Sequence, residues 1–94
     1  MHTDDITLFE LRRQVAGFRA QVGRTVVADF VTRAGEHLEW ALERPGERFP
    51  AAWYIGRAKS DLRMAGRSAG RDFPVRAARA FELADLAEVL ERRV

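Results

Sequence analysis

The stretch from Thr25 to Pro50, TVVADFVTRAGEHLEWALERPGERFP, decides the fold class because it holds one complete helix signal and the start of the next. Its apolar residues recur at helical spacing: Val27, Phe30, Val31, Ala34, Leu38 and Ala41. Such spacing is typical of an amphipathic helix with one buried face. Thr25 is a favourable N-cap, and Pro45-Gly46 is a turn dipeptide that a helix interior tolerates poorly. We therefore predict a helix over residues 26–44.

A second helix signal precedes this stretch. Thr7-x-x-Glu10 is a capping box, and Ile6 and Leu11 stand at the positions of a hydrophobic staple. The apolar residues that follow are Leu8, Leu11, Val15, Phe18 and Val22. Their phase does not continue through Gly23, which favours a break there over the alternative of one kinked helix. We predict a helix over residues 8–22, preceded by an N-terminal arm over residues 1–6.

Two further helices are predicted after the turn. Phe49-Pro50 and Phe73-Pro74 each favour a helix start, because proline suits the first helical position. These helices are expected over residues 50–66 and 74–93. Apolar spacing is helical throughout, and no sustained alternation indicates a strand. Short loops make sequence neighbours pack side by side. The prediction is an all-α fold, a small antiparallel four-helix bundle that forms a single domain over residues 1–94.

Charge is unevenly distributed along the chain. Residues 48–79 carry eight basic and two acidic side chains, a formal charge of +6, whereas residues 1–47 and 80–94 each carry −2. The basic residues predicted to form one surface on the third and fourth helices are Arg57, Lys59, Arg63, Arg67, Arg71, Arg76 and Arg79. Lys59, Arg63 and Arg67 repeat every four residues, so they share a helix edge. Such a surface favours an acidic protein surface or a phosphate backbone as its partner.

Both tryptophans lie outside the apolar stripes of their helices. Trp40 and Trp53 are therefore predicted to anchor an interface, in which Arg44 and Arg57 could stack on the rings. The alternative is that both rings lie across the rim of a broad core. A second apolar line on the first helix, formed by Phe9, Ala16 and Ala20, is predicted to join the interface. A short chain gains stability from a further interface, so we expect a homodimer.

The chain offers few groups for catalysis. It contains two histidines, two serines, one tyrosine and no cysteine, and no base is spaced for a nucleophile. His37 is interpreted as a packed or capping histidine, because no second ligand suggests a metal site. We predict no enzyme activity, no cofactor, no metal and no small-molecule substrate.

The composition of the chain also indicates its source and its cellular compartment. Fifteen arginines beside one lysine are typical of a G+C-rich bacterial coding bias. No apolar run approaches the roughly 20 residues of a membrane span, and no secretory signal is evident at the start. Together with the lack of cysteine, these observations favour a cytoplasmic protein without membrane contact.

These observations lead to two expectations about function. The first is a non-enzymatic protein-interaction or regulatory module that self-associates through its tryptophans and meets an acidic partner with its basic surface. The alternative is a nucleic-acid-binding regulator that contacts mainly phosphates through the third and fourth helices, without a helix-turn-helix.

Overall fold

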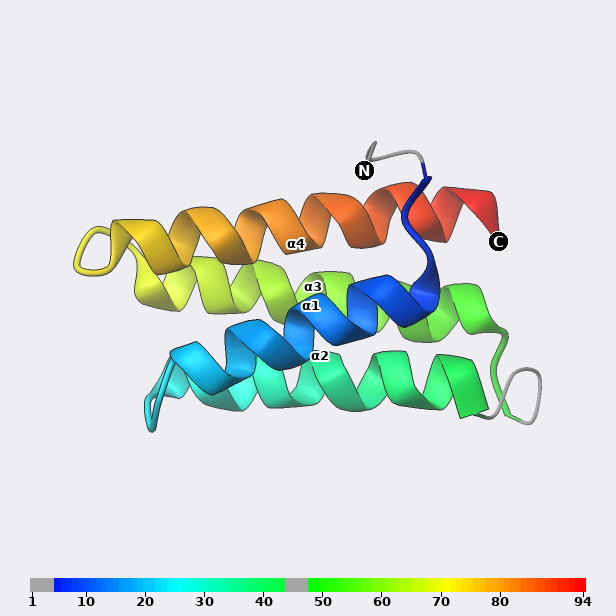
Figure 1. Cartoon of the computed structure of the whole chain (residues 1–94), viewed down its shortest axis with the longest axis horizontal. Helices are drawn as coiled ribbons and strands as arrows, with labels where there is room; N and C mark the ends of the chain where they lie inside the picture. Colours follow the sequence, from blue (N-terminus) through cyan, green and yellow to red (C-terminus); the bar gives the residue numbers. More distant parts are fainter. Residues whose placement is uncertain (1–4, 44–47) are drawn as a thin grey trace.

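Helices account for nearly all of the regular structure (Figure 1). A computed structural model describes residues 5–43 and 48–94, and in these residues there are four helices and no strand. The helices are α1 (Leu8–Gln21), α2 (Val26–Glu43), α3 (Ala51–Ala69) and α4 (Pro74–Arg93). The predicted all-α four-helix bundle is confirmed.

The helices run alternately up and down, and α1 crosses in front of α3 (Figure 1). Extensive contacts join α2 to α3 and α3 to α4, whereas α1 packs mainly on α2, less on α4, and makes no close backbone approach to α3. The bundle is flattened, with principal extents of 38 × 27 × 18 Å. Therefore α1 and α3 lie diagonally opposite, on the two broad sides of the molecule.

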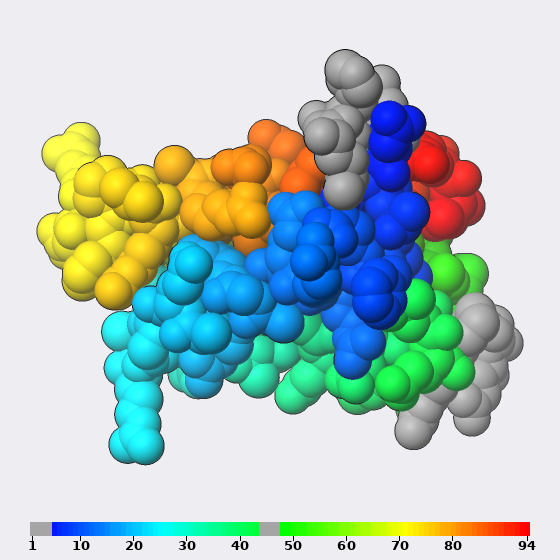
Figure 2. Space-filling model, in the orientation of Figure 1, coloured from blue at the N-terminus to red at the C-terminus, as the bar shows by residue number. Residues whose placement is uncertain are grey.

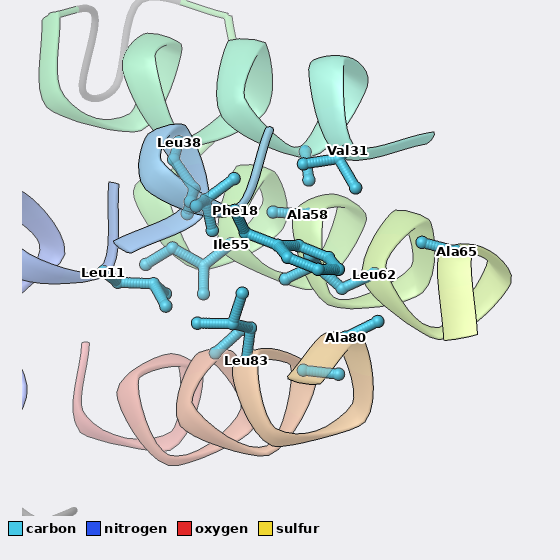
Figure 3. Close-up of a cluster of buried hydrophobic side chains, with 14 of the residues drawn as sticks. Leu11, Phe18, Val31, Leu38, Ile55, Ala58, Leu62, Ala65, Ala80 and Leu83 are labelled. Atoms are coloured by element: carbon cyan, nitrogen blue, oxygen red, sulfur yellow. The ribbon is translucent and has the colours of Figure 1, made fainter. Parts of the chain in front are cut away.

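The core lies where all four helices converge (Figure 3). Fully buried side chains come from all four helices, among them Leu11, Val31, Leu38, Ile55, Leu62 and Leu83. Many of the remaining core positions are alanine, which lets α3 approach α2 and α4 closely. A core of this kind explains why the apolar spacing of the sequence matches the observed helix faces.

The predicted start of α1 at Leu8 is confirmed, but only one half of the predicted capping box forms. The hydroxyl of Thr7 accepts a hydrogen bond from the amide of Glu10 at 3.1 Å, as a capping box requires. The carboxylate of Glu10, however, accepts from Arg13 at 2.7 Å instead of returning to Thr7. This hydrogen bond from Arg13 holds the pKa of Glu10 below its ordinary value. One half of the box caps the helix, and the other half forms a surface ion pair.

The break between the first two helices is confirmed. Gly23 has φ 65°, a left-handed conformation that favours glycine, so one continuous kinked helix is the wrong alternative. The hydroxyl of Thr25 accepts from the amide of Ala28 at 3.4 Å, which supports its predicted capping role. At the other end of α1, Ile6 is buried at 1% exposure, and its carbonyl accepts from Arg93 at 2.8 Å. The last residue of the predicted arm thus belongs to the core.

The predicted boundaries of α3 need two corrections. Pro50 is the N-cap of α3 rather than its first helical residue. The helix also continues past Gly66, which we had predicted as its end, and terminates at Gly70, where φ is 52°. The ring of Phe81 on α4 packs directly against the backbone of Gly66. A side chain at residue 66 would occupy the place of that ring.

Candidate functional site

Ion pairs divide the predicted basic surface. Nζ of Lys59 lies 2.5 Å from a carboxylate oxygen of Glu91, and Nη2 of Arg63 lies 3.7 Å from one of Glu88. Both pairs cross from α3 to α4, so these two cations hold the helices together and add little net charge to the surface. The predicted edge of Lys59, Arg63 and Arg67 is therefore interrupted.

Arg79 is also engaged within the chain. It donates from Nη1 to Glu82 at 2.6 Å and from Nη2 to Gln14 on α1 at 3.1 Å. Arg79 therefore faces α1, whereas the pairs of Lys59 and Arg63 lie on the α3 side of α4. The seven predicted basic residues do not form one continuous patch.

Three arginines keep their positive charge around the turn between α3 and α4. We call Arg67, Arg71 and Arg76 the arginine corner. Across residues 5–43 and 48–94, none of the three forms an ion pair with a carboxylate. The guanidinium carbon of Arg76 lies 4.8 Å from the centroid of the Phe73 ring, a favourable cation–π distance. This corner carries positive charge at one end of α3, and Asp72 is the acidic residue of the same turn.

An aromatic cluster joins the end of α2 to the start of α3. Its members are His37, Trp40, Phe49, Trp53 and Tyr54. Tyr54 is the buried centre, with ring centroids 6.1 Å from Trp40, 6.0 Å from Phe49 and 5.2 Å from Trp53. Trp53 stacks on Phe49 at 4.0 Å, and His37 meets Trp40 edge-on at 5.6 Å. Trp40 therefore helps to fasten α2 to α3, and Trp53 packs on Phe49, which precedes α3.

The two tryptophans nevertheless remain partly exposed. Trp40 and Trp53 each keep 40% of their surface accessible. The predicted stack of Arg57 on Trp53 is confirmed, with the guanidinium carbon 5.7 Å from the ring centroid. The predicted stack on Trp40 involves Arg44, which lies outside the described residues. The contacts of both rings with Tyr54 fit the alternative in which the rings lie across the rim of the core. The interface stays a prediction, for which the exposed parts of both rings are available.

One side of α3 carries a line of exposed residues. We call this line the α3 stripe: Trp53, Arg57, Ser60, Met64 and Arg67. Its members follow at intervals of three or four residues, so they share the side of α3 that points away from the core. Met64 is 41% exposed, and Arg67 donates to its sulfur at 3.8 Å. Trp, Met and Arg are the residue types enriched at protein interfaces.

The predicted interface residues on α1 lie elsewhere. Phe9, Ala16 and Ala20 are exposed along the outer side of α1, and Phe9 is 63% exposed. This side is the face seen in Figure 2, where α1 lies between α2 and α4. Because α3 is diagonally opposite, these three residues cannot share one flat contact with Trp53.

A buried polar pair connects α2 and α3. His37 donates from Nδ1 to Oδ2 of Asp61 at 2.8 Å, and the exposures of the two side chains are 14% and 12%. The prediction of a packed histidine is consistent with this position, but its partner was not foreseen. Asp61 shares the helical face of Ala58 and Leu62, and a carboxylate among core positions signals a buried partner. The pair holds α2 beside α3, and the Nδ1 atom of His37 is occupied by its hydrogen bond to Asp61.

An apolar groove of about 780 Å³ opens where the end of α1 diverges from the start of α4, on the face seen in Figure 2. Phe18 lies beneath it, Val75 lines its wall, and Arg76 and Arg79 lie among its lining residues. Arg79 is already paired with Glu82, so the groove combines apolar surface with the guanidinium group of Arg76.

The chain gives little other indication of chemistry. Among the described residues, no three histidine or carboxylate side chains gather as they would around a metal ion. The helices described here are too short or too polar for any of them to span a bilayer. Comparison with known protein families, curated proteins and solved structures finds no match to this chain.

Proposed function

We propose that this chain is a non-enzymatic helical module that binds proteins, and that it associates with itself through the α3 stripe. The observation that carries the proposal is the exposure of an indole and a thioether, alternating with two arginines, on one side of α3. Large apolar groups flanked by guanidinium groups are typical of the anchor residues of interfaces. The aromatic cluster holds Trp53 in place, which reduces the entropy lost on binding.

The dimensions of the molecule support a modest contact. The broad side that bears α3 measures 38 × 27 Å, enough for the roughly 800 Å² per partner of a standard interface. With two anchor residues per chain, a dissociation constant near 1 µM, or about −8 kcal/mol, is a reasonable expectation. The arginine corner, at one end of α3, is the surface proposed for an acidic partner.

The experiment is size-exclusion chromatography with light scattering of the wild type, the double variant Trp53→Ala/Met64→Ala and the matched control Phe9→Ala. We expect the wild type and Phe9→Ala to be dimers, because Phe9 lies on the opposite broad side. The double variant should be a monomer, with circular dichroism showing that its helices are intact. Dissociation by Phe9→Ala alone would move the interface to α1 and contradict the proposal.

The arginine corner supports nucleic-acid binding as a second candidate function. Three unpaired guanidinium groups could neutralise about three phosphates, so log K for a labelled duplex should fall with log salt at a slope of about −3. Fluorescence anisotropy over a series of salt concentrations measures this slope, and Arg71→Ala should reduce it by about 1. A steep slope in the wild type would favour this candidate, and absence of binding at low salt would exclude it.

A further inference from the structure

The α3 stripe has the spacing of a coiled-coil seam. From Trp53 to Arg67 the intervals are four, three, four and three residues, an average of 3.5. This period keeps a seam directed at a partner helix along its whole length. In such a seam the heptad positions a and d alternate. Antiparallel helices place each a position of one helix opposite a d position of the other. The stripe therefore matches a reversed copy of itself.

We propose that the α3 stripe binds the α3 stripe of a second copy of this chain in antiparallel orientation, with the two-fold axis passing between Arg57 and Ser60. This inference rests on the proposed function and adds the identity and direction of the partner helix. Symmetric pairing through one self-complementary surface is the commonest form of dimer. Each contact of the seam then occurs twice.

The outer layers of this seam pair the exposed apolar groups. Trp53 of one copy faces Met64 of the other, and these side chains keep 40% and 41% of their surface accessible in the single chain. Contact between an indole and a thioether is favourable, and it removes both groups from water. No parallel arrangement achieves this, because it would place Trp53 opposite Trp53 and Met64 opposite Met64.

The inner layers accommodate the arginines. Arg57 faces Ser60, whose small side chain leaves space for the longer one. Because the guanidinium of Arg57 stacks on Trp53, it lies near the level of Trp53, about one and a half turns away from the axis. The two Arg57 guanidinium groups are then about 15 Å apart along the helices, beyond the Debye length of about 8 Å. Their repulsion is therefore screened.

The neighbouring helix adds a further contact. The hydrogen bond from His37 to Asp61 sets α2 beside α3, so Trp40 lies close to the level of Ala58. This level is next to the two-fold axis, and the Trp40 residues of the two copies approach one another there. The exposed parts of both tryptophans are then covered by one contact.

Disulfide trapping tests the direction of the helices, and the chain has no cysteine to interfere. In an equimolar mixture, Arg57→Cys and Ser60→Cys should form mainly the mixed disulfide. At about 10 µM protein it should form about a hundredfold faster than the disulfide of Ser68→Cys, because a contact holds thiols at about millimolar effective concentration. Ser68 is exposed and lies outside the stripe, so it measures random collision.

Met64→Cys distinguishes the orientations. In the antiparallel seam the two Met64 positions are about 16 Å apart along the axis, so this variant should link no faster than Ser68→Cys. Rapid linkage of Met64→Cys with itself would show a parallel pair, which overturns this inference and keeps the proposed function. If the wild type is a dimer but neither Arg57→Cys with Ser60→Cys nor Met64→Cys with itself links faster than Ser68→Cys, the contact lies on another face. A monomeric wild type would overturn both proposals.

Discussion

Gly66→Ala tests how closely α3 and α4 pack. A Cβ atom at residue 66 would lie 2.7 Å from two carbons of the Phe81 ring, closer than real Cβ contacts allow. The ring is 40% exposed, so it can swing outward, and the cost is its lost burial rather than an unrelieved clash. A phenylalanine buries roughly 200 Å², so complete loss of the covered part would cost about 3 kcal/mol.

Two terms reduce this cost. The displaced ring keeps part of its contacts, and replacing glycine by alanine inside a helix contributes about 1 kcal/mol of stability. We therefore expect Gly66→Ala to lower the free energy of unfolding by about 1–2 kcal/mol. The matched control is Gly17→Ala in α1, where a Cβ would meet nothing within 4 Å. That variant should be stabilised by about 0.5–1 kcal/mol.

Urea denaturation followed by circular dichroism gives both free energies. The decisive comparison repeats Gly66→Ala in a Phe81→Ala background, where the obstructing ring is absent and the substitution should become stabilising. If Gly66→Ala stabilises the wild type as much as Gly17→Ala does, the close approach of α3 and α4 at this point is refuted.

Four further substitutions test the fold, each measured by the same denaturation assay. Thr7→Ala should destabilise the protein by about 1 kcal/mol, because the amide of Glu10 loses its cap; an unchanged midpoint would mean that the cap contributes nothing. Leu62→Ala should cost about 2–5 kcal/mol through a cavity at a fully buried position, whereas Arg63→Ala should cost less than about 1 kcal/mol. Equal costs for these two variants would contradict the assigned inner side of α3. His37→Ala should cost about 1–3 kcal/mol, because Asp61 loses its hydrogen-bond donor in a buried setting; no loss would mean that water replaces the imidazole.

Helix positions were predictable because they depend on local signals. Thr7, Gly23 and the apolar spacing each act within a few residues, and α4 begins and ends where the sequence predicts. Gly66 was misjudged because its reason for being glycine is the ring of Phe81, which comes from another helix. Helix-ending glycines and packing glycines look alike in sequence, and only the approach of α4 separates them.

The candidate site was predictable in its residue types but not in its grouping. Basic residues at four-residue intervals share an edge of α3, yet the sequence does not show that Glu88 and Glu91 approach that edge. Two of the predicted cations are therefore paired across helices. The tryptophans were correctly set apart from the apolar stripes, but their common partner Tyr54 belongs to the core and gave no separate signal. The grouping depends on which side of each helix contacts a neighbouring helix, and tertiary packing decides this rather than local sequence.

Sedimentation equilibrium of the unmodified chain tests the central proposal most directly. At about 20 µM, a contact worth about 8 kcal/mol would leave most of the protein associated. We expect the mass of a dimer, twice the chain mass of 10.7 kDa, with dissociation on dilution below about 1 µM. A mass of one chain at every concentration up to tens of micromolar would contradict self-association through the α3 stripe.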